Sequence, residues 1–222
     1  MLVSIIIPTY KDSYYVRNFS LRSVLNQTYS NFEVLIGNDG NNPEIKEYIQ
    51  NLNDSRIKYW EFKKSNFRDA KEAWCVGGAV ARNECLDLVK GNLIAPLDHD
   101  DIWGPTYLAD RVKFFTENPN VEFTYTKAAY IQNNRVATIF GKSNGEQIPH
   151  LTVIYLSKYK NFKYNETGNV AADYLLWEKF KENKIPLTFI DKITSLYNEK
   201  NNSVERIENI YFKHFGVNFK KL

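Results

Sequence analysis

The chain has 222 residues, of which 43% are hydrophobic and 25% are charged, and its formal net charge is +3. This composition is typical of one globular domain and excludes collagenous, disordered and mostly membrane-embedded proteins. The small net charge also argues against a dedicated nucleic-acid-binding protein.

The apolar runs of the sequence are too short to cross a membrane. None approaches the ~18 consecutive apolar residues of a membrane span. The apolar start at residues 3–7 stops at Pro8, before a secretory signal could be completed. We therefore expect a cytoplasmic protein with no membrane segment in this chain.

Short apolar runs alternate with amphipathic stretches over the first 120 residues. The runs predict strands at residues 3–7, 32–36, 57–62 and 93–97, and the amphipathic stretches predict helices at 16–27, 45–52, 76–89 and 107–117. Repeated strand-helix cycles favour parallel pairing, with helices covering both faces of the sheet. The predicted fold class is α/β, with an open, mostly parallel sheet flanked by helices.

The regular alternation of predicted strands and helices stops in the second half of the chain. Strands are predicted at residues 121–127, 135–140 and 187–190, and helices at 173–183 and 207–214. The polar, glycine-containing stretch at 141–147 is predicted to be a mobile loop that could close over a bound ligand.

The two cysteines do not indicate a disulfide. Cys75 and Cys85 lie ten positions apart in a helix-like stretch, where about 15 Å of helical rise keeps them too far apart to bridge. We expect buried thiols. With three histidines and no zinc-binding motif, a structural zinc site is also not expected.

Polar residues follow three of the predicted strands. Pro8-Thr9-Tyr10 follows the first, Asn38-Asp39-Gly40 the second and Asp98-His99-Asp100-Asp101 the fourth. Open sheets of this kind bind ligands beyond the carboxyl ends of their strands. Carboxylates far apart in sequence are therefore expected to converge at one edge.

Each acidic residue also has a simpler interpretation. Asp98, Asp100 and Asp101 suit a divalent cation that shares substrate phosphates, although Asp101 could merely cap a turn. Asp39 could accept a hydrogen bond from a base or a ribose, or belong to an ordinary turn. Asp173 opens a predicted helix, where a carboxylate is favoured in any case.

Two further residues are ambiguous in the same way. Tyr10 could stack on a planar base or simply cover apolar surface. Arg82 could contact a phosphate, although a solvated arginine is the commoner case.

Several segments together resemble the family 2 inverting glycosyltransferases, nucleotide-sugar enzymes of the GT-A fold. They are residues 3–10, 23–29, 32–36, 81–83, 97–103 with Pro105, 173–177 and 202–204. The resemblance implies a single domain over residues 1–222, with a Rossmann-like nucleotide-sugar-binding half at 1–120 and a smaller acceptor-binding half with a C-terminal helix at 121–222.

The resemblance also implies roles for individual residues. Nucleotide-sugar binding would involve Pro8, Thr9, Tyr10, Asp39, Arg82 and Asp98. Among these, Tyr10 would stack on the base, Asp39 would hydrogen-bond it, and Asp98 would hold the ribose side. Asp100 would bind Mn²⁺ or Mg²⁺ at the diphosphate, and Asp173 would be the general base.

The sequence departs from the family pattern at two places. Asn38 stands where the family usually has an acid, a change expected to bear on base preference. Asn198 and Lys200 stand in a segment where the family often has a histidine. This second change would leave the metal with fewer protein ligands or place a lysine beside the phosphates.

The expected function is metal-dependent, inverting transfer of a sugar from a nucleoside-diphosphate donor to a glycan, lipid-linked or protein-linked hydroxyl. UDP is the expected nucleotide, and one base acting opposite the leaving group predicts inversion. The chain could also be a module of a larger synthase. The alternatives are a sugar-phosphate nucleotidylyltransferase, disfavoured because residues 8–12 lack glycine, and a non-catalytic nucleotide-sugar or glycan-binding domain.

Overall fold

The computed structural model describes residues 1–199 and 201–220, and the chain divides into two compact units. Each unit is assembled from three separate segments. Unit 1 comprises Met1–Ser13, Asn31–Ala95 and Tyr155–Pro186, and unit 2 comprises Tyr14–Ser30, Pro96–Ile154 and Leu187–Leu222. The predicted donor and acceptor halves, divided at residue 120, remain a prediction about function.

The sheet of unit 1 confirms the parallel arrangement predicted for the first half of the chain. Its strands are β1 (Val3–Thr9), β2 (Phe32–Asp39), β3 (Ile57–Phe62), β4 (Leu93–Pro96) and β8 (Ile154–Leu156), in the order β3-β2-β1-β4-β8. β1 and β3 both pair with β2 in parallel, whereas β8 runs antiparallel to β4. Every residue of β1 and β2 is buried, as expected for strands covered on both faces.

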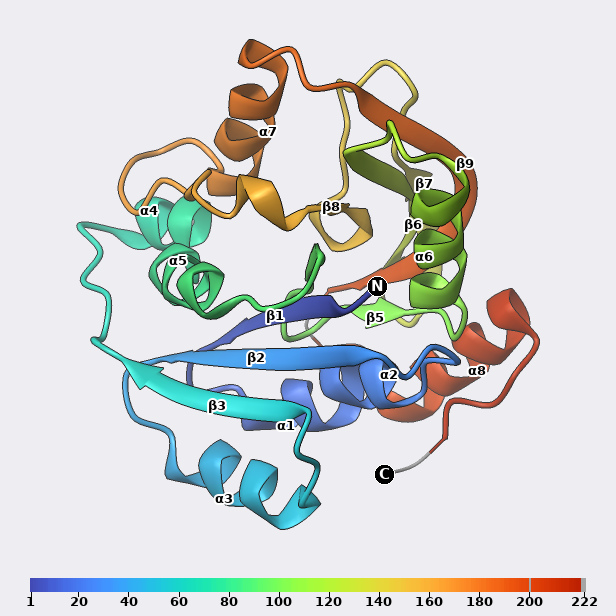
Figure 1. Ribbon diagram of the computed structural model, residues 1–222. Coiled ribbons are helices and arrows are strands. Elements are labelled where there is room, and N and C mark those ends of the chain that lie inside the picture. The colour runs from blue at the N-terminus through green and yellow to red at the C-terminus, as the bar shows by residue number, and fades with distance from the viewer. Residues whose placement is uncertain (200, 221–222) are drawn as a thin grey trace. The chain divides into compact units, whose positions relative to one another are not determined.

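The helices of unit 1 lie on both faces of this sheet (Figure 1). They are α3 (Pro43–Leu52), α4 (Ala70–Val76), α5 (Ala79–Leu88) and α7 (Ala172–Glu182), with a short 3-10 turn at Ser157–Tyr159. α3 covers one side of β2 and β3, and α5 lies across the other. α5 approaches β2 closely at Gly37, where a Cβ atom would lie 2.8 Å from the Cys85 Sγ atom.

The predicted helix at 76–89 corresponds to α5, which begins three residues later than predicted, and the separate helix α4 before it was not predicted. α4 ends at Val76 and α5 begins at Ala79, with Gly78 between them at a φ of 77°. A side chain would strain that left-handed conformation. Cys75 and Cys85 consequently lie on different helices, and both are free and buried as predicted.

One buried carboxylate of β2 connects β1, β3 and the segment before β4 within unit 1. Glu33 is 5% exposed and accepts hydrogen bonds from the Ser4 hydroxyl at 2.7 Å, the Lys90 N–H at 2.8 Å and the Lys58 ammonium at 3.3 Å. Burial alone would raise the pKa of Glu33, but these three donors lower it below its usual value. The ionised carboxylate is therefore part of the native packing.

Unit 2 contains the other strands of the nine-stranded sheet, and their pairing is mixed. Its strands are β5 (Ile102–Trp103), β6 (Phe123–Gln132), β7 (Arg135–Phe140) and β9 (Leu187–Asn198). β6 and β9 are parallel, β5 is antiparallel to β9, and β7 is antiparallel to β6. The helical segments are η1 (Val16–Ser20), α2 (Leu21–Leu25), α6 (Tyr107–Glu117), η2 (His150–Thr152) and α8 (Val204–Phe215), and α1 (Ser13–Tyr15) begins at the junction of the units.

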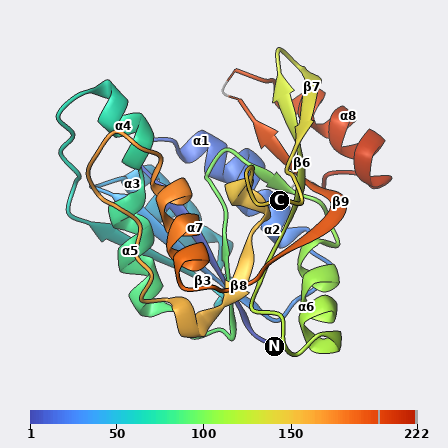
Figure 2. The ribbon, with the colours of Figure 1, turned by 90° about the horizontal axis from the view of Figure 1, so that it is seen from above.

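α8 lies beside β6 and β9 in both views of the ribbon (Figures 1 and 2). Its buried residues Ile207 and Tyr211 pack against Ala129 and Ile131 of β6 and Leu196 of β9. These contacts form the hydrophobic core of this part of unit 2. One face of the sheet is thus covered by α8.

Three predictions for the second half need correction. β6 extends to Gln132 and β9 to Asn198, well beyond the predicted ends at residues 127 and 190. The predicted mobile loop at 141–147 is an anchored turn, because the Tyr125 hydroxyl donates to the Lys142 carbonyl at 2.7 Å and accepts from the Gly145 N–H at 3.1 Å.

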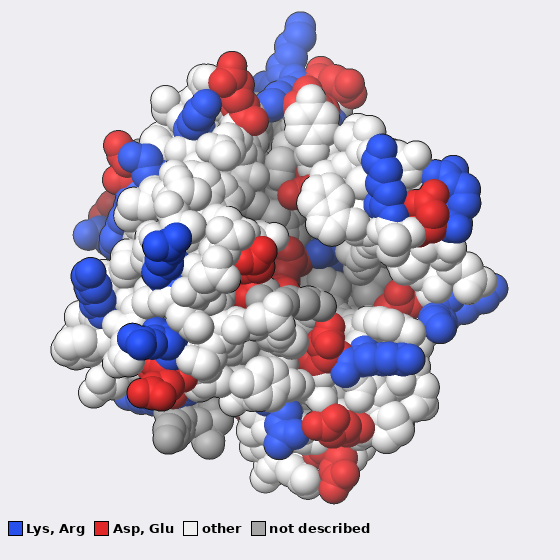
Figure 3. Space-filling model, turned by 180° about the vertical axis from the view of Figure 1, so that it is seen from behind, with Lys and Arg blue, Asp and Glu red and all other residues white. Residues whose placement is uncertain are grey.

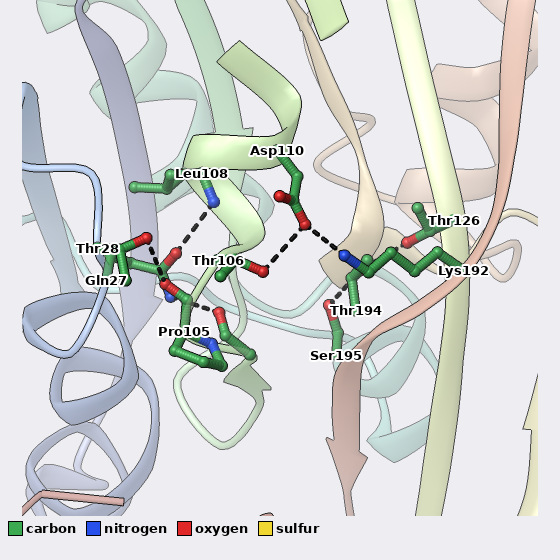
Figure 4. A network of polar contacts seen from close by, with 11 residues as sticks. Gln27, Thr28, Pro105, Thr106, Leu108, Asp110, Thr126, Lys192, Thr194 and Ser195 are labelled. Atoms are coloured by element: carbon green, nitrogen blue, oxygen red, sulfur yellow. Dashed lines mark hydrogen bonds and ion pairs between the residues drawn. The ribbon is translucent and has the colours of Figure 1, made fainter. Parts of the chain in front are cut away.

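The N-terminus of α6 is held by side chains from other segments of unit 2 (Figure 4). The Gln27 Oε1 atom accepts the Leu108 N–H at 3.0 Å, and its Nε2 atom donates to the Gly104 carbonyl at 2.8 Å. Asp110 accepts hydrogen bonds from Thr106 at 2.9 Å and Lys192 at 2.5 Å. Gln27 therefore supplies the acceptor that a capping side chain usually provides.

Among the helices of the described residues, none combines the length and apolar character needed to cross a bilayer. On the face shown in Figure 3, lysines and arginines are interspersed with aspartates and glutamates and form no continuous basic tract. That distribution agrees with the small net charge of the sequence.

Candidate active site

The carboxyl ends of β1 and β2 bring two polar side chains of unit 1 together. Thr9 and Asn38 are register partners in the parallel pair, and both are buried. The Thr9 Oγ1 and Asn38 Oδ1 atoms have no hydrogen-bond partner among the described residues. Buried polar atoms are nearly always paired, so this pair indicates a place where a ligand or an ordered water completes the structure.

Asn38 and Asp39 are each held in place by one local hydrogen bond. The Asn38 Nδ2 atom donates to the Gly40 carbonyl at 2.9 Å, a contact that an ionised aspartate could not make. Asp39 is 6% exposed, and its Oδ1 atom accepts the Ser65 N–H at 2.6 Å. The Asp39 carboxylate is thereby oriented, with Oδ2 left for a ligand donor.

Tyr10 lies next to this turn with an accessible ring. Gly40 has a φ of 100°, and a Cβ atom there would lie 3.5 Å from Lys64 and 4.0 Å from the Tyr10 ring. Tyr10 is 38% exposed, and the ammonium groups of Lys11 and Lys64 lie 5.4 and 5.7 Å from its ring centroid. Lys64, and to a smaller extent Lys11, lowers the pKa of Tyr10. An accessible ring flanked by two cations suits a planar, anionic ligand.

Arg82 reaches the end of β1 through the glycine turn before α5. A Cβ atom on Gly78 would lie 3.1 Å from the Pro8 Cβ atom and 3.2 Å from the Arg82 Nη1 atom. Nη1 donates to the Gly77 carbonyl at 3.0 Å, and the guanidinium carbon lies 5.4 Å from the Tyr164 ring centroid. The guanidinium is therefore positioned rather than freely solvated.

The structure thus brings together five residues that the sequence predicted for nucleotide-sugar binding. They are Pro8, Thr9, Tyr10, Asp39 and Arg82, all in unit 1. Lys64 was not predicted, because it lies in an irregular segment after β3 and carries no local signal.

Asp173 is the second residue of α7, in the same unit. The N-cap is Ala171, so the simpler interpretation of Asp173 as a helix cap is wrong. A carboxylate in the first turn is still favoured by the helix dipole. Asp173 is partly exposed, and the described contacts do not link it to the Tyr10 and Asp39 cluster. Its role as general base remains a prediction.

The acidic segment after β4 belongs to unit 2 and is tied to the end of β9. Asp101 is 1% exposed, and its Oδ1 atom accepts the Asn198 N–H at 3.0 Å. The Asn198 Nδ2 atom donates to the Asp100 carbonyl at 3.0 Å. Asn198 accepts in turn a hydrogen bond from Asn202 at 2.9 Å. Asp101 therefore has a structural role, because it connects the acidic segment to the end of β9.

Asp98 and Asp100 have partly exposed carboxylates, and each has a histidine nearby. The side chains are 28% and 20% exposed. The His150 Nδ1 atom lies 3.5 Å from the Asp98 Oδ2 atom, and the His99 Nδ1 atom lies 3.9 Å from the Asp100 Oδ1 atom. His150 comes from η2 and was not singled out in the sequence, because only the fold brings it to Asp98.

The chemistry of these groups limits the kind of metal site that they could form. The described residues contain no cluster of three or more acidic, histidine or cysteine side chains that could hold a metal ion. One or two carboxylates do suit Mg²⁺ or Mn²⁺ when phosphates and water complete the shell. Asp98 and Asp100 therefore fit a cation that is shared with a bound diphosphate.

The predicted convergence of the two groups of site residues remains a prediction. The five nucleotide-sugar residues and Asp173 belong to unit 1, whereas Asp98 and Asp100 belong to unit 2. Lys200, which was expected near the phosphates, lies outside the described residues.

Two Escherichia coli proteins are similar to this chain, and both are named UDP-Glc:alpha-D-GlcNAc-diphosphoundecaprenol beta-1,3-glucosyltransferase. WfaP is 31% identical over 194 residues, which make up 86% of this chain and 66% of WfaP. WfgD is 34% identical over 139 residues, which make up 63% of this chain and 50% of WfgD. The chain therefore spans only one half to two thirds of these relatives.

The fold is shared with a solved structure. The crystal structure of S. aureus TarS 1-349 in complex with UDP-GlcNAc superposes with a TM-score of 0.71 at 19% identity, covering 91% of this chain and 60% of that one. This similarity confirms the predicted GT-A type of α/β fold. The family model described as Glycosyl transferase family 2 matches residues 4–175, a range that includes every predicted site residue from Pro8 to Asp173. The chain belongs to glycosyl transferase family 2.

Proposed function

We propose that this protein is a metal-dependent, inverting glycosyltransferase that moves a sugar from a UDP-sugar to a hydroxyl of a glycoconjugate acceptor. The observation that supports this proposal most strongly is the cluster of residues at the ends of β1 and β2. It combines the unpartnered atoms of Thr9 and Asn38 with an oriented Asp39 and an accessible Tyr10 ring. Membership of family 2 and the UDP-Glc donor in the names of WfaP and WfgD support UDP.

The nucleotide is proposed to bind through three kinds of contact. The Tyr10 ring stacks on the base. The Asp39 Oδ2 atom accepts an N–H from the base, because Oδ1 is already bonded to Ser65. Lys64 and Arg82 supply positive charge for the phosphates, since both lie within the same cluster of unit 1.

Asp100 is proposed to hold Mn²⁺ or Mg²⁺ at the diphosphate, and Asp98 is proposed to hold the ribose side of the nucleotide. A divalent cation at the diphosphate supplies charge neutralisation for the departing nucleoside diphosphate. Asn198 contributes by holding the backbone of the acidic segment against the end of β9. The partial exposure of both carboxylates is consistent with these roles.

Asp173 is proposed to take the proton from the attacking acceptor hydroxyl. A single base acting opposite the leaving group gives inversion at the anomeric carbon, whereas retention would need a nucleophilic carboxylate on the sugar. The proposed acceptor is a sugar attached to a lipid diphosphate, which the names of WfaP and WfgD support. The proposed location is cytoplasmic, and the chain could act within a larger synthase.

A nucleotide-binding experiment tests the donor site. UDP, GDP and dTDP are titrated into the protein with and without Mn²⁺, and thermal shift and calorimetry report binding. We expect UDP to bind best and Mn²⁺ to strengthen it. Tyr10→Ala should weaken UDP about tenfold, the equivalent of one lost stacking contact. Tyr14→Ala is the control, because Tyr14 is 53% exposed and lies in unit 2.

A transfer assay tests the chemistry. UDP-glucose is incubated with a synthetic GlcNAc-α-diphospho-lipid, and NMR of the product reports the anomeric configuration. Asp173→Asn should lower the transfer rate at least about a hundredfold while UDP binding persists. Glu182→Gln, on the exposed end of the same helix, is the control.

Other outcomes would favour the alternatives. UDP binding without transfer to any acceptor would indicate a nucleotide-sugar-binding module. Formation of UDP-glucose from UTP and glucose 1-phosphate would indicate a nucleotidylyltransferase. Normal transfer by Asp173→Asn would reject Asp173 as the base, and the absence of binding by any nucleotide would reject the donor site.

A further inference from the structure

The sheet of unit 2 leaves aromatic side chains on the face opposite α8. Ala129 and Ile131 of β6 and Leu196 of β9 point into the core under α8. Because successive side chains of a strand point to opposite faces, Tyr130 and Tyr197 point the other way. They are register partners in the parallel β6-β9 pair and therefore lie side by side.

Phe140 of β7 completes this group, which we call the aromatic platform (Tyr130, Phe140 and Tyr197). The Tyr130 and Tyr197 ring centroids are 5.4 Å apart, and the Phe140 and Tyr197 centroids are 5.8 Å apart with an interplanar angle of 83°. Tyr197 is 41% exposed, and the other two rings are partly exposed. Edge contacts from Phe140 steady the Tyr197 ring and leave part of its surface accessible.

The platform adjoins the acidic segment of the same unit. Ile102 pairs with Leu196, so Asp101 lies beside Tyr197 at the end of β9.

This combination of groups favours one class of ligand. Three rings are too small an apolar area for a stable protein interface. A pyranose ring presents an apolar C–H face for the rings and hydroxyls for polar groups at their edge. Gln132, which donates to the Tyr130 hydroxyl at 3.3 Å, supplies an amide at this edge.

We propose that the aromatic platform binds the terminal pyranose residue of the acceptor, with Tyr197 as its principal stacking ring. This inference rests on the proposed function, because it takes the acceptor to be a sugar. It assigns acceptor recognition to the ends of β6, β7 and β9 in unit 2. None of these three residues takes part in the proposed donor site.

The first experiment measures sugar binding without catalysis. Saturation-transfer NMR is recorded with methyl N-acetyl-α-D-glucosaminide and the wild-type protein, Tyr197→Phe and Tyr197→Leu. Tyr197→Phe keeps the ring, whereas Tyr197→Leu keeps apolar bulk but removes the π face. We expect the leucine variant to weaken binding about tenfold, as for one lost stacking contact, and the phenylalanine variant to change it less than about threefold.

The second experiment separates the acceptor from the donor. The KM for the GlcNAc-α-diphospho-lipid should rise about tenfold in Tyr197→Leu, while the Kd of UDP stays at the wild-type value. Phe212→Ala is the matched control, because Phe212 is 55% exposed on α8 and lies outside the platform. Circular dichroism confirms that each variant is folded, and Phe140→Leu provides a second test if Tyr197→Leu does not fold.

The outcomes distinguish this inference from the proposed function. If the wild type transfers sugar and Tyr197→Leu has an unchanged acceptor KM, the platform proposal is overturned alone. If Tyr197→Leu weakens UDP as much as the acceptor, the platform serves the donor and the inference is also wrong. If the glycoside binds through Tyr197 but no UDP-sugar is ever used, the platform stands and the proposed function fails.

Discussion

Asn198 offers a direct test of how the acidic segment is held. Its side chain is 2% exposed, donates to the Asp100 carbonyl at 3.0 Å and accepts from Asn202 at 2.9 Å. Replacement of Asn198 by alanine removes both hydrogen bonds. The backbone bond from the Asn198 N–H to Asp101 is retained, so the strand pairing should persist while the acidic segment loses one of its anchors.

The expected loss of stability follows from these two contacts. Each buried side-chain hydrogen bond contributes about 1 kcal/mol, and an incompletely filled site adds to the cost, so Asn198→Ala should lose about 2 to 3 kcal/mol. For a protein of this size, that corresponds to a fall in Tm of about 4 to 12 °C. Asn198→Asp should lose more, because a carboxylate oxygen would face the Asp100 carbonyl and add charge beside Asp101.

The assay combines thermal unfolding with nucleotide binding. We expect Asn198→Ala to fold, to melt earlier and to lose part of the Mn²⁺-dependent strengthening of UDP binding. Asn118→Ala is the control, because Asn118 is exposed and makes a local hydrogen bond at the end of α6. A Tm within about 1 °C of wild type would refute the assigned anchoring, because it would correspond to a loss of unfolding free energy below about half a kcal/mol.

Three further substitutions test the packing. Glu33→Gln should lose about 2 kcal/mol of stability at pH 7. Because the native pKa of Glu33 is lowered, its carboxylate stabilises the fold only while it is ionised, so the difference in stability from wild type should shrink as the pH falls below 4.5. A difference that does not depend on pH in denaturant titrations would contradict this. Gln27→Leu should destabilise the protein around the start of α6 by about 3 kcal/mol, because the side chain loses three hydrogen bonds, to Ser23, Gly104 and Leu108. Unchanged amide exchange at the start of α6 would argue against it. Gly91→Ala would place a Cβ atom 2.7 Å from the Ser4 backbone nitrogen. Urea unfolding should therefore show a loss of stability of about 2 kcal/mol. An unchanged unfolding midpoint would mean that β1 can shift to accommodate the added atom without a loss of stability.

Long elements with a continuous pattern could be predicted from the sequence, and short ones could not. β1 and β2 are uninterrupted apolar runs because both faces are buried, and that pattern needs no tertiary information. β5 has two residues and β8 has three, too few for any periodicity. β9 was predicted to end at residue 190 because polar residues follow, yet pairing with β6 carries the strand through them.

In the candidate site, too, some residues could be predicted from the sequence and others could not. Tyr10 and Asp39 could be predicted because parallel strands place their carboxyl ends at one edge. Lys64 and His150 approach the predicted residues from segments whose position depends on the whole fold. Local spacing carries no information about such neighbours.

The alternation of the two units along the chain has a consequence for biosynthesis. Unit 1 includes residues 155–186 and unit 2 includes residues 187–222, so unit 2 cannot be complete before the third segment of unit 1 has been synthesised. β9, the partner of both β5 and β6, follows both of these strands in the chain. Until β9 has been synthesised, the edge of β6 that pairs with it is open to wrong pairing.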